Sequence, residues 1–299
     1  MHSPIKYFGG KGGGLGKEIY KHFPSQSQFD TYIEPFGGAA SMLFTKEPYG
    51  SEIYNDLEEN VNAFFKVLSD PKRFKKFKEK CDLALYSRQI RSEFIADLKK
   101  DDLDLVDRAF KFFIVNRSSI NGIGGFSITS NYIRRGMSKS VSDFLSSVDG
   151  LPKAHDRFSR VIIEKTDGIE LIKKYDRHNV FIYADPPYHQ DTRTSARYKV
   201  DMDNESQKKL IDVILGVKRA MVLLSGYKSK ESDRLVKSGW KCIKIKVNTI
   251  GGDRKPKTKI EYLWKNYVIE NKNLKTKLSS SKNKTHKKNK NNGDNIFNV

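Results

Sequence analysis

The sequence predicts an α/β fold with a mixed, mostly parallel sheet that ends in a C-terminal antiparallel hairpin. Short apolar runs bounded by turn residues predict strands, and amphipathic helical patterns separate most of them. Such alternation of strands and helices is typical of a parallel sheet. A hydrophobic content of 37% over 299 residues is enough for one packed core that carries an inserted subdomain.

The strand candidates are apolar runs followed by turn residues, and they lie at 31–36, 52–56, 161–167, 180–188, 221–227, 242–250 and 260–267. A helix is predicted in 57–70, where Val61, Phe64, Phe65 and Leu68 share one face. A second helical pattern fills 205–218, and we expect Asn204 to be its N-cap. No helical pattern separates the last two strands, so they should form an antiparallel hairpin at one edge of the sheet.

The stretch 71–155 interrupts this order, because it is mostly helical and charged and shows no convincing strand. We therefore expect residues 1–70 and 156–270 to form the main domain, and 71–155 to be an inserted helical subdomain. Residues 271–299 are rich in Lys, Asn and Ser and almost free of apolar residues. Such a composition predicts a disordered basic tail.

The net charge of +20 favours an anionic partner, and nucleic acid is the first candidate. The tail holds eight lysines and one aspartate, which leaves +13 for the remainder, so the basic character is not confined to the tail. A basic protein that binds no nucleic acid is the alternative. Two cysteines, no apolar run long enough to span a membrane and no signal peptide suggest a cytoplasmic protein.

The N-terminal stretch KYFGGKGGGLGKEIY (6–20) is rich in glycine and lysine, but it does not fit a phosphate-binding P-loop. Lys11 stands where the first glycine of that motif belongs, and Glu18 stands where Ser or Thr should bind magnesium. A flexible N-terminal arm is the other interpretation that the stretch alone allows.

The run FIYADPPYH (181–189) predicts a buried strand followed by a turn that carries chemistry. Two prolines fix the backbone, so the Pro186 carbonyl projects as a rigid acceptor beside the Asp185 carboxylate. Tyr188 adds a flat ring. The arrangement suits a planar substrate with an amino group, although an ordinary turn at the end of a strand remains the alternative.

The run TYIEPFGGAASMLF (31–44) predicts a strand, a glycine turn and a helix. In nucleotide-binding α/β folds, an acid about 20 residues later takes ribose hydroxyls. Asp56 lies eighteen residues after Gly38, at the end of the next predicted strand. Together these features indicate a nucleotide-like cofactor; a structural turn and an N-cap aspartate are the plainer interpretation.

Four motifs in order resemble the Dam-like (alpha-group) DNA adenine-N6 methyltransferases, which use S-adenosylmethionine. They are Tyr7 to Lys11, Glu34 to Gly38, Asn55-Asp56, and Asp185 to Tyr188. FFIVNRSSINGIGG resembles the start of the family's target-recognition loop, and GGDRKPKTKIEYLWKNY also matches in kind, so the resemblance covers roughly residues 4–268. It implies a Rossmann-like methyltransferase fold, with 71–155 as the target-recognition insertion.

The resemblance implies roles for the motif residues. The cofactor-binding residues would be Tyr7, Lys11, Glu34, Pro35, Phe36, Gly38, Asp56 and Asp185. Lys11 would lie near the methionine carboxylate of the cofactor, and Asp56 would take its ribose. Asp185 and the Pro186 carbonyl would hold the target amine while Tyr188 stacks on the adenine, which must be flipped out of the duplex. No metal is implied.

The resemblance also implies double-stranded DNA as the partner. The candidates for DNA contacts are Arg117, Asn121, Arg134, Arg135, Arg254, Lys255 and Lys257. Two features depart from the family pattern. Ala40 replaces a glycine of the cofactor turn, which we expect to be tolerated. Ile120 and Gly125 replace an aromatic residue and the arginine that reads guanine in GATC-specific members, so recognition of GATC is not expected.

The predicted function is site-specific methylation of adenine N6 in duplex DNA. The alternatives are methylation of cytosine N4 or of adenine in RNA, and an inactive DNA-binding relative. Asp185 in place of serine favours adenine, and the joint presence of Lys11, Asp56 and Asp185 favours an active enzyme. We expect a monomer, with a dimer on DNA as the alternative, in the cytoplasm of a bacterium or a phage-infected host, where a cognate restriction endonuclease could accompany it.

Overall fold

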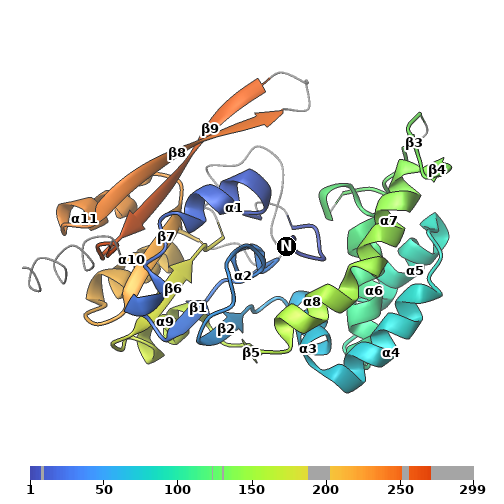
Figure 1. Cartoon of the computed structure of the whole chain (residues 1–299), viewed down its shortest axis with the longest axis horizontal. Helices are drawn as coiled ribbons and strands as arrows, with labels where there is room; N and C mark the ends of the chain where they lie inside the picture. The colour runs from blue at the N-terminus through green and yellow to red at the C-terminus, as the bar shows by residue number, and fades with distance from the viewer. Residues whose placement is uncertain (8–9, 123, 130, 188–202, 251–255, 271–299) are drawn as a thin grey trace, which may run out of the picture.

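The computed structural model describes residues 1–270 with the exception of 8–9, 123, 130, 188–202 and 251–255. Its centre is a seven-stranded sheet with the order β5-β2-β1-β6-β7-β9-β8 (Figure 1). The strands are β1 (Thr31–Glu34), β2 (Ser51–Asn55), β5 (Val161–Glu164), β6 (Val180–Ala184), β7 (Met221–Gly226), β8 (Lys241–Ile250) and β9 (Pro256–Lys265). Each of the seven strands predicted from the sequence is thus present.

The pairing directions confirm the predicted sheet. Neighbours from β5 to β7 are parallel, whereas β9 is antiparallel to both β7 and β8. The β8–β9 hairpin therefore closes one edge, as the missing helix between these strands predicted. Six of the seven predicted runs extend past their strands, among them 31–36 and 180–188, whose strands end at Glu34 and Ala184. In two of them a proline follows closely, and proline cannot donate a hydrogen bond to a neighbouring strand.

Both faces of the sheet are buried, as is usual for parallel strands. Ile33 and Ile182 face an aliphatic cluster on one side, whereas Tyr32 and Phe181 face an aromatic cluster on the other. The aliphatic face is covered by α9 (Gly168–Lys174), α10 (Asn204–Gly216) and α11 (Lys230–Lys237). Successive side chains point to opposite faces, so unbroken apolar strands supply both clusters.

The remaining helices are α1 (Gly13–Tyr20), α2 (Ser41–Thr45), α3 (Glu59–Ser69), α4 (Pro71–Asp82), α5 (Arg88–Asp97), α6 (Leu105–Ser118), α7 (Lys139–Asp149) and α8 (Leu151–Phe158), with short 3-10 turns at Gln26–Gln28 and Ile120–Gly122. In α3 the predicted apolar face is confirmed: Val61, Phe64, Phe65 and Leu68 are all buried. One cap was predicted wrongly. Asp203, not Asn204, caps α10, because the Asp203 carboxylate accepts the Ser206 N–H at 2.8 Å.

The stretch 71–155 is helical as expected, and α4 to α7 gather on the right of Figure 1. It also holds a two-stranded hairpin that the sequence did not reveal, β3 (Ile133–Arg134) with β4 (Met137–Ser138). Arg135 and Gly136 form its turn, and both have positive φ, as a tight two-residue hairpin turn requires. Strands of two residues are too short to leave an alternating pattern, which explains the omission.

The insertion shares its core with the sheet. Phe77, Phe113 and Phe144 belong to the same buried cluster as Tyr54 and Phe181. Helix α8 spans the predicted boundary between 155 and 156, and it is fixed to the sheet by charge. The sheet and the insertion therefore do not have separate cores, and the division of the chain into a catalytic domain and an insertion stays a proposal about their functions. The predicted tail lies outside the described residues.

A buried ion cluster joins α8 to β2 and to the segment after α2. Glu52 on β2 pairs with Lys46 and receives two hydrogen bonds from Arg157 of α8, at 2.6 and 2.9 Å. Arg157 also donates to the Leu43 carbonyl at 3.0 Å. The Glu52 side chain is 1% exposed, so its two cations depend on it for compensation.

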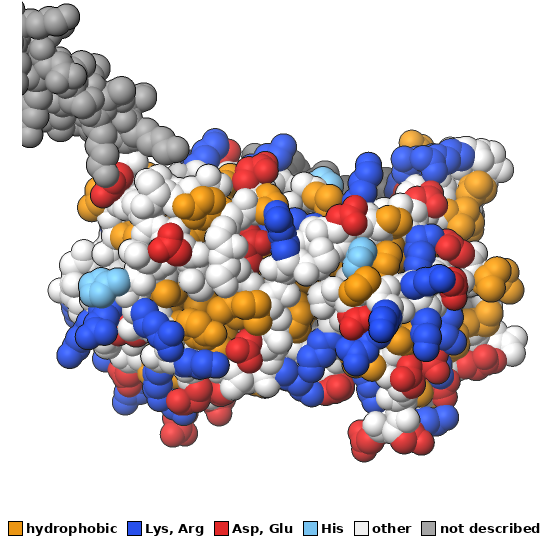
Figure 2. All heavy atoms as spheres, turned by 60° about the horizontal axis from the view of Figure 1, so that its bottom comes forward, with side chains coloured by type: hydrophobic (Ala, Val, Ile, Leu, Met, Phe, Trp, Pro, Cys, Tyr) orange, Lys and Arg blue, Asp and Glu red, His pale blue; other side chains and the backbone are white. Residues whose placement is uncertain are grey.

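The surface drawn in Figure 2 mixes Lys and Arg with Asp and Glu, so this face is not a uniformly basic surface. Among the described residues, no helix has the length and apolar composition that crossing a membrane would need.

Candidate functional site

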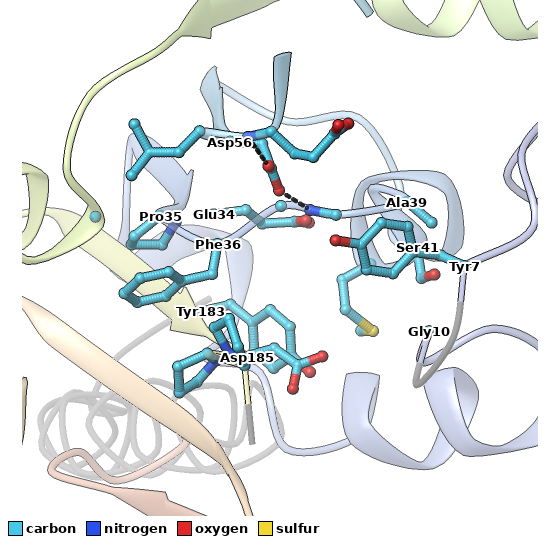
Figure 3. Close-up of a pocket in the computed structure, with 18 of the residues that line it drawn as sticks. Tyr7, Gly10, Glu34, Pro35, Phe36, Ala39, Ser41, Asp56, Tyr183 and Asp185 are labelled. Atoms are coloured by element: carbon cyan, nitrogen blue, oxygen red, sulfur yellow. Dashed lines mark hydrogen bonds between the residues drawn. The ribbon is translucent and has the colours of Figure 1, made fainter. Parts of the chain in front are cut away.

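A cavity of about 230 Å³ opens at the carboxyl ends of β1, β2, β5 and β6 (Figure 3). It is the place where open α/β sheets bind ligands. All the residues predicted to bind the cofactor line it, namely Tyr7, Lys11, Glu34, Pro35, Phe36, Gly38, Asp56 and Asp185. Pro186 lines it too. The structure thus brings together residues that are up to about 180 positions apart in the sequence, and their roles remain predictions.

The turn after β1 forms one wall of the cavity. Two of its positions, Gly37 and Gly38, favour glycine. A Cβ on Gly37 would lie 2.2 Å from Cε2 of Tyr54, and Gly38 has φ +48°. The Tyr54 hydroxyl donates to the Gly38 carbonyl at 2.7 Å. Tyr7 packs over the same turn, since a Cβ on Gly38 would lie 3.0 Å from Cε1 of Tyr7. The turn is therefore held from below by Tyr54 and from the cavity side by Tyr7.

Asp56 connects the second strand to this turn. Its carboxylate accepts the Gly38 N–H at 2.7 Å and the Glu58 N–H at 2.8 Å (Figure 3). Burial raises the pKa of Asp56 to about 6, although these two backbone bonds lower it. Each carboxylate oxygen has a further lone pair, so Asp56 can hold the turn and still accept from a ligand hydroxyl.

Glu34 lies at the floor of the cavity with 2% exposure. It accepts a hydrogen bond from the Tyr32 hydroxyl at 2.8 Å. Burial raises the pKa of Glu34 to about 8, against the lowering effect of Tyr32 and the Leu43 backbone. Glu34 thus joins β1 to α2 underneath the glycine turn.

The N-terminal stretch is not a loose arm. The Lys6 backbone exchanges two hydrogen bonds with the Asn116 side chain, at 2.8 and 2.7 Å, and its ammonium donates to the carbonyls of Arg117 and Ser119. Burial first, and then the Arg117 charge, lower the pKa of Lys6 to about 8. These bonds fix the segment that carries Tyr7 to the end of α6.

Lys11 joins this segment to the turn after β6. Its ammonium lies 3.1 Å from Oδ1 of Asp185 and 3.2 Å from Oε1 of Glu261, and its side chain is 3% exposed. Burial would lower the pKa of Lys11, but the two carboxylates together raise it above its ordinary value. Lys11 thus lies beside Asp185, far from it in the sequence, and its contact with a cofactor carboxylate stays a prediction.

Asp185 is the acid of the predicted catalytic turn. Burial raises its pKa to about 6; the Lys11 ammonium lowers it and Glu261 raises it. Above this pH the carboxylate is ionised and can accept hydrogen bonds from a ligand amine. Pro186 and Pro187 also line a second, smaller cavity of about 70 Å³, whose wall includes Ser225, Tyr227 and Trp264. Tyr188 lies outside the described residues.

The candidate DNA contacts are only partly described. Arg117 lies at the end of α6, where burial lowers its pKa, and Asn121 adopts φ +53° in the following turn. Arg134 and Arg135 lie on the exposed β3–β4 hairpin, with Arg134 bonded to Asp143 at 2.9 Å. Arg254 and Lys255 lie outside the described residues, and of Lys257 only its place in β9 is described.

The sequence reasoning missed two parts of the cavity wall. Asp167 and Gly168 follow β5, and a Cβ on Gly168 would lie 2.5 Å from the Phe36 ring. A turn-forming Asp-Gly at the end of a predicted strand was the available signal. Glu261 was also missed; its signal is an acid among apolar residues in IEYLW, where a buried charge requires a partner.

Substitutions in the glycine turn test its packing. Gly37→Ala should lower the free energy of unfolding by about 1–3 kcal/mol, because the new methyl group overlaps the Tyr54 ring. Ala40→Gly is the matched control. Ala40 has φ +54°, so relief of strain should offset the loss of a buried methyl, and the change should stay within about 1 kcal/mol. Urea unfolding measures both, and equal effects would contradict this account of the turn.

Comparison with known proteins gives a family and a relative that this chain resembles. A model of a family described as D12 class N6 adenine-specific DNA methyltransferase matches residues 7–250. The Type II methyltransferase M.MjaIII of Methanocaldococcus jannaschii is 25% identical over 228 residues, which cover 69% of this chain and 76% of that protein.

Solved structures give a weaker likeness. Two structures of the rRNA methyltransferase aviRa from Streptomyces viridochromogenes align over 84% of this chain and over 82% and 83% of theirs. Their TM-scores are 0.35, with sequence identities of 10% and 12%. At such TM-scores the likeness to aviRa carries no argument about fold or function.

Proposed function

The chain belongs to the D12 class family of N6 adenine-specific DNA methyltransferases, and on that premise we propose that it binds S-adenosylmethionine in the cavity beside Asp185. Its substrate is DNA and its acceptor is the N6 amine of adenine. The observation that carries the proposal is the convergence of the predicted cofactor residues on one cavity.

The residues present fit this cofactor. Backbone at Gly37 and Gly38 permits close approach, while Tyr7 and Phe36 offer aromatic surfaces for a flat or apolar part of the ligand. Asp56, at the end of β2, offers carboxylate oxygens to ribose hydroxyls. Lys11 is the cation that we assign to the methionine carboxylate, in addition to its two carboxylate partners.

When bound, S-adenosylmethionine supplies an electrophilic methyl group. The chain's own task is to activate a poor nucleophile, since the lone pair of an aromatic amine is delocalised into its ring. The Asp185 carboxylate and the Pro186 carbonyl accept the two N–H bonds, which favours a tetrahedral nitrogen whose lone pair is available. As positive charge develops on that nitrogen, the ionised Asp185 stabilises it, and fixed alignment of the reactants supplies much of the remaining acceleration.

The adenine must leave the duplex to reach Asp185. Flipping costs a few kcal/mol, and stacking on an aromatic ring returns roughly 1–3 kcal/mol. We assign the stacking to Tyr188. Contacts from Arg117, Asn121, Arg134, Arg135 and the 254–257 segment to DNA should supply further, salt-dependent affinity.

We also propose that the protein is a cytoplasmic monomer that protects DNA against a cognate restriction endonuclease. The printed name of M.MjaIII, a Type II methyltransferase, supports the endonuclease partner. Sedimentation of the protein alone and with duplex DNA tests the monomer, and a dimer in either sample would contradict it.

Binding measurements test the cofactor site directly. Calorimetry should show that S-adenosylmethionine binds the wild-type protein, and that Asp56→Ala lowers the affinity by about tenfold or more, since a charged hydrogen-bond partner is lost. Glu170→Gln, in an exposed pair with Lys173, is the control and should bind as the wild type does. No binding to the wild type, or full affinity in Asp56→Ala, would contradict the proposed site.

A further inference from the structure

The turn that carries Asp185 is supported by a buried polar group from β9, the strand next to the edge strand β8. Glu261 lies on β9 with 5% exposure, and its Oε1 lies 3.2 Å from the Lys11 ammonium. The same oxygen accepts a hydrogen bond from the Ser225 hydroxyl of β7 at 2.6 Å. Ser225 is itself fully buried. A buried carboxylate held by two donors has a defined position, which is the condition for acting on its neighbours.

Lys11 lies between two acids rather than paired with one. Oδ1 of Asp185 is 3.1 Å from its ammonium on one side, and Glu261 is at nearly the same distance on the other. With both acids ionised, the three side chains carry a net charge of −1. Without Glu261, the Lys11 charge would neutralise Asp185 fully.

This charge matters at the reacting amine. The amine becomes positive as the new bond forms, and a site with net negative charge stabilises that charge more than a neutral ion pair does. A carboxylate that shares its cation with a second carboxylate is a stronger hydrogen-bond acceptor than a carboxylate that has a cation to itself. The buried location strengthens the effect, because little water screens the charges.

We propose that Glu261, anchored by Ser225, is a positioning residue of methyl transfer: it holds the Lys11 ammonium and keeps a net negative charge on the Lys11–Asp185–Glu261 cluster that faces the target amine. The inference rests on the proposed role of Asp185. It adds a residue on β9 that makes its contribution through Lys11 and Asp185.

Glu261→Gln separates charge from shape, since the amide oxygen can still accept from Ser225 and Lys11. Single-turnover methylation should slow by about tenfold, the factor that corresponds to one pKa unit of lost interaction. Affinity for S-adenosylmethionine should not fall, because Lys11 loses a competing anion. Glu170→Gln is again the matched surface control.

The pH dependence distinguishes this role from a structural one. Asp185 is faced by Lys11, Glu261 and Tyr183, and Glu261 raises its pKa while Lys11 lowers it. In the wild type, activity should be lost as the pH falls through about 6, where Asp185 becomes protonated. In Glu261→Gln a negative neighbour is gone, so this midpoint should move to lower pH.

The titration can be read without catalysis. Infrared difference spectra of DNA-free protein, with the Asp185→Asn variant subtracted, report the carboxylic acid band of Asp185. The band's midpoint should lie at lower pH in Glu261→Gln. Ser225→Ala keeps the charge but removes the anchor, so its midpoint should stay near the wild-type value while the rate falls by less than in Glu261→Gln.

Each outcome decides between the roles. An unchanged infrared midpoint in Glu261→Gln, or a slower rate accompanied by an equal loss of cofactor affinity, would overturn the proposal. A shift in Ser225→Ala as large as that in Glu261→Gln would also contradict it. Absence of methyl transfer in the wild type would overturn the proposed function instead, and the infrared titration would still test Glu261.

Discussion

Replacing Asp185 with asparagine is expected to slow methyl transfer by about 100- to 1000-fold, the loss typical when one preorganised electrostatic group is removed from a reacting centre. The amide cannot supply the negative charge, and its NH₂ group would compete with the target amine as a donor. Asp185→Ala should abolish transfer while the fold persists. Single-turnover assays with labelled cofactor measure both rates.

The binding behaviour of these variants separates chemistry from folding. Asp185→Asn should keep the unfolding transition and most of its affinity for DNA, since the Arg and Lys residues proposed to contact DNA lie outside the turn. Glu170→Gln should retain the wild-type rate. Full activity in Asp185→Ala would refute the assigned mechanism.

Glu52→Gln is expected to lower the free energy of unfolding by about 3–5 kcal/mol, the usual cost of breaking a buried ion pair. Glu52 is the shared anion of Lys46 and Arg157, and all three side chains are at most 7% exposed. Removal of its charge leaves two buried cations uncompensated. Urea unfolding at neutral pH gives the value.

Two further measurements sharpen this test. Burial already lowers the pKa of Lys46, so in Glu52→Gln the loss should shrink as the pH rises and Lys46 can release its proton. Glu170→Gln, which breaks an exposed pair at 2.8 Å, should cost no more than about 1 kcal/mol. Similar losses in the two variants would mean that the buried cluster contributes nothing beyond a surface pair.

The strands, and the cavity residues that directly follow them, were predictable because they depend on local sequence patterns. Apolar runs ending at Glu34, Asn55 and Ala184 mark three adjacent strands, and the carboxyl ends of parallel strands meet at one edge. In the observed strand order β2-β1-β6, Asp56 and Asp185 follow strands that are separated only by β1. The cap of α10 was wrong by one residue because Asp203 and Asn204 are both good caps.

The features that were missed depend on packing between distant segments. Nothing near Glu261 in the sequence indicates Lys11 or Ser225, which come from the N-terminal stretch and from β7. Gly168 is required by the ring of Phe36, from a different strand end. The shared core of the sheet and the insertion is likewise a tertiary property, which composition alone does not reveal.

The most direct test of the central claim is the identity of the methylated base. Purified protein is incubated with methyl-labelled S-adenosylmethionine and unmethylated duplex DNA, and the DNA is then digested to nucleosides. The account predicts label in N6-methyldeoxyadenosine, with none in DNA treated with Asp185→Ala. Label found only in N4-methylcytosine, or only in RNA supplied in a parallel reaction, or in no nucleic acid at all, would contradict it.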